Sequence, residues 1–206
     1  MANNPRLSLL ASLLKGYDTV LDIGTDHGFV LREALDLGYI KKGIAADIGE
    51  QPLQKAKNNL IGYPVEFILS NGFEHVDLSY DAVVIAGMGV YTISEILKQN
   101  HESKTYFLQP NDKYDSLRMY LMENGFKIID EFVIFDKFYY VIMKVIKEHM
   151  TLNEEDIYVG PILKTKKEAK PYFLHMIQQY EKIMEVCDEK SKQKFSKIVT
   201  YLRKYI

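Results

Sequence analysis

Short hydrophobic runs recur through the first two thirds of the chain and are separated by longer segments with helical spacing. The runs are rich in Val, Ile, Leu, Ala and Phe, as buried parallel strands are. They cover Thr19–Ile23, Gly43–Asp47, Val65–Leu69, Ala82–Ala86 and Thr105–Leu108. The intervening segments predict helices over Phe29–Leu37, Gln51–Leu60, Val90–Gln99 and Tyr114–Asn124. This alternation favours a doubly wound α/β fold.

The pattern changes after Gly125. Ile128–Asp136 and Tyr139–Glu148 are consecutive β-prone runs that only Lys137 and Phe138 separate. Two such runs around a short turn predict an antiparallel hairpin. Added to the five preceding runs, the hairpin gives a mostly parallel seven-stranded sheet with an antiparallel end.

From Lys164 onward the hydrophobic spacing is helical. An apolar seam with steps of three and four is interrupted by the polar run 188–194 and then resumes. The seam consists of Phe173, Met176, Tyr180, Ile183 and Cys187, followed by Phe195, Ile198 and Leu202. We therefore expect two antiparallel helices joined near 188–192, forming a small helical domain over 161–206 beside a sheet domain over 1–160.

Composition places the chain among ordinary globular proteins. It has 206 residues, 47% hydrophobic content and a net charge of -2. No apolar run approaches the ~20 residues of a membrane helix, and the start has no basic and apolar leader pattern. The single Cys187 excludes an internal disulfide, and no Cys or His spacing supports a metal site. We expect a cytoplasmic protein without metal.

Charge is distributed unevenly along the chain. Residues 164–206 hold 11 Lys and Arg against 5 Asp and Glu, while residues 1–163 hold 15 against 23. An acidic body with a basic tail favours contact of the tail with an anionic macromolecule. An ordinary lysine-rich helical surface gives the same counts, so this alternative stays open.

The most informative motif follows the first predicted strand. In the stretch from Asp22 to Gly28, Gly24 and Gly28 allow a sharp turn and close approach of a ligand. A dinucleotide loop accepts a pyrophosphate, which Asp22 and Asp26 would repel. Two carboxylates suit a ligand with a cationic centre, such as S-adenosylmethionine. The stretch matches the D-x-G-x-G-x-G loop of methyltransferases, except that Asp26 replaces the middle glycine. We therefore expect these residues to contact that cofactor.

His27 lies inside the same loop, and its position predicts a cofactor contact, although a lone His is more often a structural hydrogen-bonding residue. Asp47 closes the second predicted strand, where an acid commonly binds ribose hydroxyls. It also suits the N-terminus of the following helix. Asn71 can pair with an adenine edge, although Asn-Gly is a common turn. With these residues, Ile48 and Gly72 complete the predicted cofactor site.

The fourth predicted strand runs into Ala86-Gly87-Met88-Gly89. The (N/D/S)-P-P-(Y/F) tetrapeptide of enzymes that methylate exocyclic adenine nitrogens is missing here. We expect Ala86 and Gly87 to contact the cofactor, and Gly87 and Met88 to offer bare backbone groups to the reacting atoms. The alternative is a tight turn with Met88 in the core.

Three further polar residues are candidates for substrate contact. Gln109 and Asn111 follow the fifth predicted strand, at the sheet edge where ligands bind in such folds. They equally suit helix capping. Arg6 precedes the apolar segment Leu7–Leu14 and is a candidate for gripping a phosphate, or else a solvated charge.

Together, these motifs resemble the bacterial TrmK family, the tRNA adenine-N1 methyltransferases that modify adenine 22. The family's D-I-G-[ST]-D-H-A-Y loop is similar to Asp22–Phe29, its A-G-M-G-G turn to Ala86–Val90, and its L-Q-P-N to Leu108–Asn111. Pro5-Arg6-Leu7 and Val159-Gly160-Pro161 match further family segments, so the resemblance covers essentially the whole chain.

The chain also departs from the family pattern. Gly28 replaces Ala, Phe29 replaces Tyr, and Val90 replaces Gly. Asp47 stands where relatives often carry Glu. Val90 is expected to add bulk beside the active-site turn, and the tail looks shorter than in typical relatives.

The resemblance implies a Rossmann-like class I methyltransferase fold, S-adenosylmethionine as cofactor and tRNA as partner, with the protein acting as a monomer. N1 of adenine has an available lone pair, so methyl transfer to it depends on alignment more than on deprotonation. Asp26 or a backbone carbonyl at Gly87 or Met88 is expected to stabilise the cationic product. The target base must be exposed by local opening or flipping.

The basic tail is expected to hold the RNA backbone. The residues proposed for this contact are Lys164, Lys166, Lys167 and Lys170. Two other functions stay open: a methyltransferase that acts on a small molecule or a protein, and a non-catalytic protein that binds the cofactor or RNA.

Overall fold

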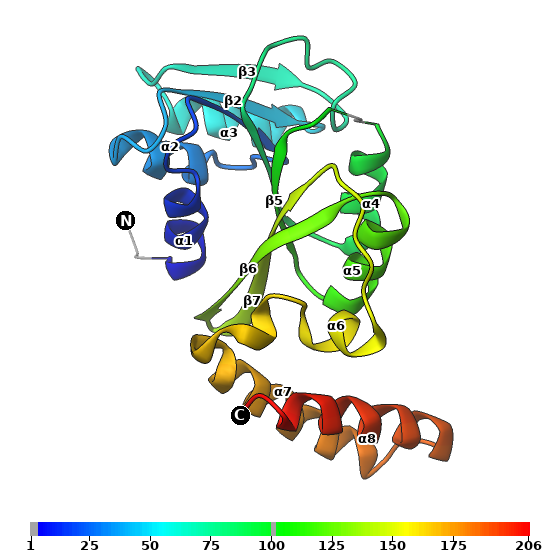
Figure 1. Ribbon diagram of the computed structural model, residues 1–206. Coiled ribbons are helices and arrows are strands. Elements are labelled where there is room, and N and C mark those ends of the chain that lie inside the picture. The colour runs from blue at the N-terminus through cyan, green and yellow to red at the C-terminus, as the bar shows by residue number, and fades with distance from the viewer. Residues whose placement is uncertain (1–3, 100–101) are drawn as a thin grey trace.

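The computed structural model describes residues 4–99 and 102–206, which form a seven-stranded sheet flanked by helices (Figure 1). The strand order is β3-β2-β1-β4-β5-β7-β6. The strands are β1 (Thr19–Ile23), β2 (Lys42–Asp47), β3 (Val65–Leu69), β4 (Ala82–Met88), β5 (Thr105–Pro110), β6 (Lys127–Asp136) and β7 (Phe138–Ile146). β1 to β5 run parallel, whereas β7 runs antiparallel to both β5 and β6. The predicted sheet and its antiparallel end are therefore confirmed.

Helices cover both faces of the sheet, because successive residues of a buried strand point to opposite faces. Val83 and Ile85 of β4 join the core on the α4 and α5 side, whereas Ala82 and Val84 pack on the α1 and α2 side. The helices are α1 (Pro5–Leu13), α2 (Phe29–Asp36), α3 (Glu50–Asn59), α4 (Val90–Lys98), α5 (Tyr114–Glu123), α6 (Glu154–Val159), α7 (Lys170–Met184) and α8 (Glu189–Arg203). The predicted helices between the strands agree with α2 to α5 to within about two residues.

Three details differ from the sequence-based expectation. The hairpin turns at Lys137 alone, with a φ of 61°, and Phe138 already belongs to β7. β4 and β5 each continue by two residues beyond the predicted ends, to Met88 and Pro110. The short α6 was not predicted, because six residues are too few to establish a hydrophobic period; a capping box at Asn153 marks its start.

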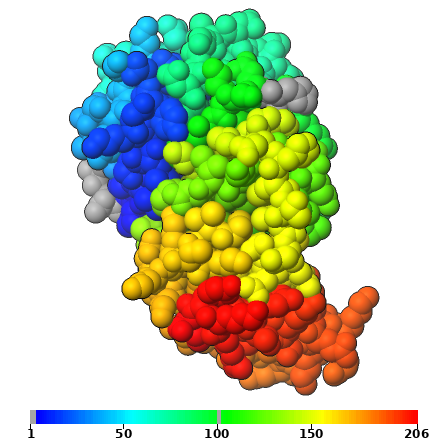
Figure 2. All heavy atoms as spheres, in the orientation of Figure 1, coloured from blue at the N-terminus to red at the C-terminus, as the bar shows by residue number. Residues whose placement is uncertain are grey.

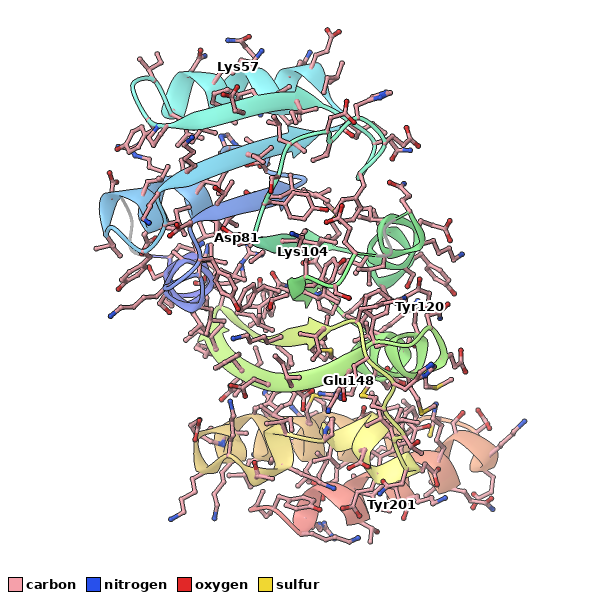
Figure 3. All side chains as sticks on the ribbon, turned by 45° about the horizontal axis from the view of Figure 1, so that its top comes forward. Lys57, Asp81, Lys104, Tyr120, Glu148 and Tyr201 are labelled. Carbon is pink, nitrogen blue, oxygen red and sulfur yellow. The ribbon has the colours of Figure 1, made fainter. Side chains whose placement is uncertain are left out.

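α7 and α8 form the predicted pair of helices, joined by residues 185–188 rather than by 188–192. Asp188 caps α8 by accepting a hydrogen bond from the Ser191 N–H at 3.0 Å. The seam is buried near Phe173 and Leu202 but opens toward the connection, where Val186 is 88% exposed. Tyr201 of α8, labelled in Figure 3, donates from its hydroxyl to Glu154 of α6 at 3.2 Å.

The helical end projects from one end of the sheet region (Figure 2), and the two parts share an interior. Arg118 of α5 and Glu131 of β6 are buried, and Arg118 Nε donates to Glu131 Oε1 at 2.8 Å. Glu131 Oε2 accepts the N–H groups of Ile162 and Leu163, at the start of the tail. The division at 160/161 stays a prediction. Within the described ranges, no helix is long and apolar enough to cross a bilayer.

Candidate active site

A cleft of about 920 Å³ opens at the carboxyl edge of β1 and β4, beside α1 and α2. Its volume lies in the range of small-molecule sites, roughly 300–1,000 Å³. The cleft brings together residues that are far apart in sequence but were predicted to form one site. These are Arg6, Asp22, Gly24, Asp26, His27, Ala86, Gly87 and Met88. The doubly wound topology explains the assembly, because β1 lies between β2 and β4 and their carboxyl ends meet.

Asp22, the second-last residue of β1, is a buried carboxylate at the base of the cleft, 5% exposed. The Thr25 hydroxyl donates to its Oδ2 at 2.8 Å. Burial raises the pKa of Asp22 to about 6; the Thr25 hydrogen bond opposes this shift and the nearby charge of Asp47 adds to it. A cationic ligand group beside this carboxyl would favour its ionised form.

Two features favour glycine at position 24. Its φ of +73° is a left-handed conformation, and a Cβ built there would collide with the Met88 Cε. The Met88 side chain therefore lies directly against the β1 loop. A larger residue at position 24 would displace Met88 or close the cleft.

Asp26 projects from the same loop with its side chain 62% exposed. Its φ of 47° is left-handed, a conformation that Asp tolerates better than most residues do. The His27 Nε2 lies 3.5 Å from Asp26 Oδ2, and the His27 ring stacks on Phe29 with centroids 5.1 Å apart. Asp26 thus presents an accessible carboxylate at the cleft, oriented by its histidine neighbour.

Asp47 fastens the end of β2 to the β1 loop. Its Oδ2 accepts from the Asp26 N–H at 3.2 Å, and its Oδ1 accepts from the Gly49 N–H at 2.9 Å. Asp47 does not line the cleft, and neither do three other predicted cofactor residues, Ile48, Asn71 and Gly72. They lie at the neighbouring ends of β2 and β3, and Asn71 donates its amide to Glu74. Their contact with a cofactor stays a prediction.

Gly28 is also absent from the cleft lining. It is buried beneath Leu60, where an added Cβ would lie 2.5 Å from Leu60 Cδ1. Gly28 has a φ of +71° and comes directly before the first residue of α2. Gly28 therefore shapes the loop and lets α2 approach α3, whereas Gly24 and Asp26 face the cleft.

The expectation that Gln109 emerges from the sheet to meet a substrate is wrong. Gln109 is 0% exposed, its Nε2 donates to the Pro110 carbonyl at 2.7 Å, and its Oε1 accepts from Arg6 Nη1 at 2.6 Å. The extension of β5 to Pro110 keeps this side chain inside. Gln109 therefore holds Arg6 at the cleft rather than contacting a macromolecule.

Asn111 is exposed and fastens the Gly87–Met88 turn. Its Nδ2 donates to the Gly87 carbonyl at 2.9 Å, and its N–H donates to the Met88 carbonyl at 2.9 Å. Both carbonyls expected to face a cationic product are thus already hydrogen-bonded. Val90 does not crowd this turn, contrary to expectation, because it is 7% exposed and packs in the core.

Arg6 joins the cleft to the β6–β7 hairpin. Its guanidinium lies 5.1 Å from the centroid of the Tyr140 ring, and its Nη1 lies 3.5 Å from a Cβ built on Gly87. Its Nε is buried without a hydrogen-bond partner among the described residues. Tyr140 was not singled out from the sequence, where it is one of several aromatic residues in a β-prone run.

The four lysines predicted to contact RNA differ in environment. Lys164 pairs with Asp156 at 2.6 Å, and Lys166 pairs with Asp130 and covers the Phe132 ring. Lys167 and Lys170 are exposed. The first two lysines are engaged in ion pairs within the fold, so Lys167 and Lys170 are the more accessible of the four. The RNA contact of all four lysines stays a prediction. Among residues 4–99 and 102–206, no cluster of His, Cys, Asp and Glu could hold a metal.

Comparisons with known proteins agree with this geometry. A family model described as TrmK, tRNA (adenine(22)-N(1))-methyltransferase, matches residues 20–206. The chain is 26% identical over 218 residues to a tRNA (adenine(22)-N(1))-methyltransferase of Bacillus subtilis, covering 94% of this chain and 91% of that protein.

Two solved structures with a bound ligand are similar over nearly their whole length. Sp1610 of Streptococcus pneumoniae in complex with S-adenosyl-L-methionine has a TM-score of 0.84 and 29% identity, covering 98% of each chain. TrmK of M. capricolum in complex with S-adenosyl-homocysteine has a TM-score of 0.83 and 27% identity, covering 100% of this chain and 98% of that one.

Proposed function

The chain belongs to the TrmK family of tRNA (adenine(22)-N(1))-methyltransferases, and on this premise we propose that it transfers the methyl group of S-adenosylmethionine to N1 of adenine 22 in tRNA. The observation that carries the proposal is the cleft itself. Its floor combines the acidic β1 loop with the Gly87–Met88 turn, so a cationic ligand and a planar base can meet there.

The residues of the cleft fit S-adenosylmethionine better than they fit a phosphorylated cofactor. Asp22 and Asp26 supply carboxylates for cationic groups, and the positive φ of Gly24 lets a ligand approach the backbone. Asp47, beside this loop, is the acid we assign to ribose hydroxyls. When bound, S-adenosylmethionine supplies a methyl group on a positively charged sulfur.

The chemistry asked of the protein is alignment. N1 of adenine carries its lone pair in the base plane, so no side chain has to remove a proton before the attack. We assign the stabilisation of the cationic product to Asp26, because its carboxylate is accessible whereas the carbonyls of Gly87 and Met88 already accept hydrogen bonds. Asn111 keeps the Gly87–Met88 turn in place for this alignment.

The tRNA approaches from the side of Arg6 and of the exposed Lys167 and Lys170 in this proposal. A base inside the folded tRNA must leave its stack to reach the cleft. Contacts between lysines and phosphates would make this binding salt-dependent. We also propose that the protein works as a monomer in the cytoplasm, where tRNA is modified.

The test uses the purified protein, S-adenosylmethionine and an unmodified tRNA transcript. Mass spectrometry of the digested tRNA should find N1-methyladenosine, and primer extension should stop at position 22. A transcript with guanine at position 22 is the matched substrate control. Asp26→Asn is the matched variant, because Asn tolerates the left-handed φ and removes only the charge. Cofactor binding without any methylated tRNA would contradict the proposal.

A further inference from the structure

The β6–β7 hairpin projects beyond the carboxyl edge of the sheet, next to the cleft. Leu108 of β5 pairs with Met143 of β7, so Pro110, where β5 ends, lies level with Val141. Three residues of β7 from Phe138 to Tyr140 therefore extend past β5, a distance of about 10 Å. Figure 1 places this end of the hairpin between α1 and the start of α7.

Strand alternation decides which side chains face the cleft. Ile142 packs on the α1 side of the sheet, so Tyr140 and Phe138, at intervals of two, lie on the same face. The position of Arg6 over the Tyr140 ring agrees with this assignment. Tyr139 points to the opposite face, where its ring centroid lies 5.5 Å from that of Tyr172.

Phe138 is 69% exposed at the outer end of this face. An exposed phenylalanine side chain does not gain the free energy of burial. Its neighbours Tyr140 and Arg6 continue the same surface inward to Gly87. We call Arg6, Tyr140 and Phe138 the aromatic ledge. The ledge is therefore continuous with the cleft in which the target base reacts.

We propose that the aromatic ledge binds an unstacked nucleobase of the tRNA that neighbours the target adenine, with Phe138 as its stacking surface. This inference rests on the proposed function. When the target base leaves its stack, the neighbouring base loses a stacking partner, and an aromatic ring replaces that partner without regard to base identity.

The charged residues around the ledge suit the negatively charged backbone of an RNA. Lys137 at the turn is exposed, and the guanidinium of Arg6 supplies a second cation. Asp136, which pairs with Phe138 across the hairpin, is the one acid on this face of the described tip. Phosphates flanking a base on Phe138 would be attracted by Lys137 and Arg6.

The experiment compares Phe138→Ala with Phe135→Ala. Phe135 is a matched control because it is 57% exposed at the same tip but lies against Tyr139 on the opposite face. Each variant is titrated with tRNA transcripts that carry 2-aminopurine on either side of adenine 22. We expect Phe138→Ala to weaken tRNA binding by about 5- to 50-fold and to abolish the fluorescence change. Phe135→Ala should leave both within about twofold of wild type, and Phe138→Tyr should restore both.

The outcomes separate the ledge from the proposed function. Affinity for S-adenosylmethionine and thermal stability should not change in any variant, because Phe138 and Phe135 are both exposed and both lie outside the cofactor cleft. If the wild type methylates tRNA but Phe138→Ala keeps both its tRNA affinity and the fluorescence change, the ledge proposal is wrong and the proposed function stands. No methylation of tRNA by the wild type contradicts the proposed function itself. If light scattering shows that Phe138→Ala disrupts self-association instead, the face binds a second copy and the ledge is wrong.

Discussion

Asp22 is a buried carboxyl that lines the cleft. Burial alone would favour its neutral form, and only the Thr25 hydroxyl favours the charge. The unliganded protein therefore carries a cost that a cationic ligand removes. Such stored cost is typical of binding sites, where function opposes stability.

The pH dependence of cofactor binding follows from the raised pKa of Asp22. Below pH 6 the carboxyl of the unliganded protein is protonated, so it must release a proton when a cationic ligand binds. Affinity for S-adenosylmethionine should fall toward tenfold per pH unit below about 6 and level off above it. Calorimetric titration between pH 5 and 8 measures this slope, and a flat profile would contradict the role of Asp22.

The variant Asp22→Asn tests the same carboxyl from the side of stability. Asn keeps an acceptor for Thr25 but removes the charge of the carboxyl, whose pKa is raised in the folded state. Because that charge opposes folding at pH values above 6, the unliganded variant should unfold at a higher temperature than wild type at pH 7.5. Its affinity for S-adenosylmethionine should be about 10- to 100-fold weaker. Lower stability together with unchanged affinity would refute the assignment.

Gln109 holds the guanidinium of Arg6 at the cleft, so the proposed role of Arg6 in tRNA binding can be tested at Gln109. Gln109→Leu fills the buried space but removes the acceptor of Arg6 Nη1. We expect kcat/KM for tRNA to fall by about tenfold, the worth of one hydrogen bond to a charged group. Affinity for S-adenosylmethionine should stay unchanged, which a general loss of folding would not permit. Arg6→Ala alone and combined with Gln109→Leu completes a double-mutant cycle; additive effects would show that the two residues act independently.

At the scale of elements, hydrophobic period identified the strands and helices, and contacts between elements set their ends. β4 and β5 outlast their apolar runs because Gln109 and Pro110 continue the pairing with Ala86 and Met88. That extra pairing buried Gln109, which no local pattern could predict. The loop from Asp22 to Gly28 was predictable because its chemistry is local, whereas Arg6 and Tyr140 meet only through the fold.

Gly160 links the sheet to the helical end by a backbone conformation that only glycine adopts easily. Its φ is +104°, and a Cβ would lie 2.7 Å from Glu131 Oε2 and 2.8 Å from Arg118 Nη2. Gly160→Ala should lower the free energy of unfolding by about 2–4 kcal/mol, from backbone strain and disruption of the buried pair. Gly38→Ala is the control, because its φ is +65° but the space around it is open, so about 1 kcal/mol is expected. Equal losses in urea titrations would contradict the packing argument.

At the scale of the whole molecule, much of the basic character of the tail is neutralised within the fold. Five of its cations pair with carboxylates: Lys164, Lys166, Lys197, Arg203 and Lys204. The acids of α6 account for three of these pairs. The exposed lysines without such pairs lie at the two ends of the helical hairpin. They are Lys167 and Lys170 at one end, and Lys182, Lys190, Lys192 and Lys194 at the other.

The far end of the helical hairpin should therefore contribute to tRNA affinity through charge alone. Replacing Lys190 and Lys192 by Gln removes two exposed cations, and each lost phosphate contact should flatten the plot of log K against log salt by nearly one unit. Lys55→Gln with Lys57→Gln is the matched control, since these lysines have the same spacing and Figure 3 shows Lys57 at the opposite end of the molecule. Filter binding between 50 and about 200 mM salt measures both slopes. Equal slopes for the two double variants would mean that tRNA does not reach the far end, and that the charge of the tail serves its folding onto α6.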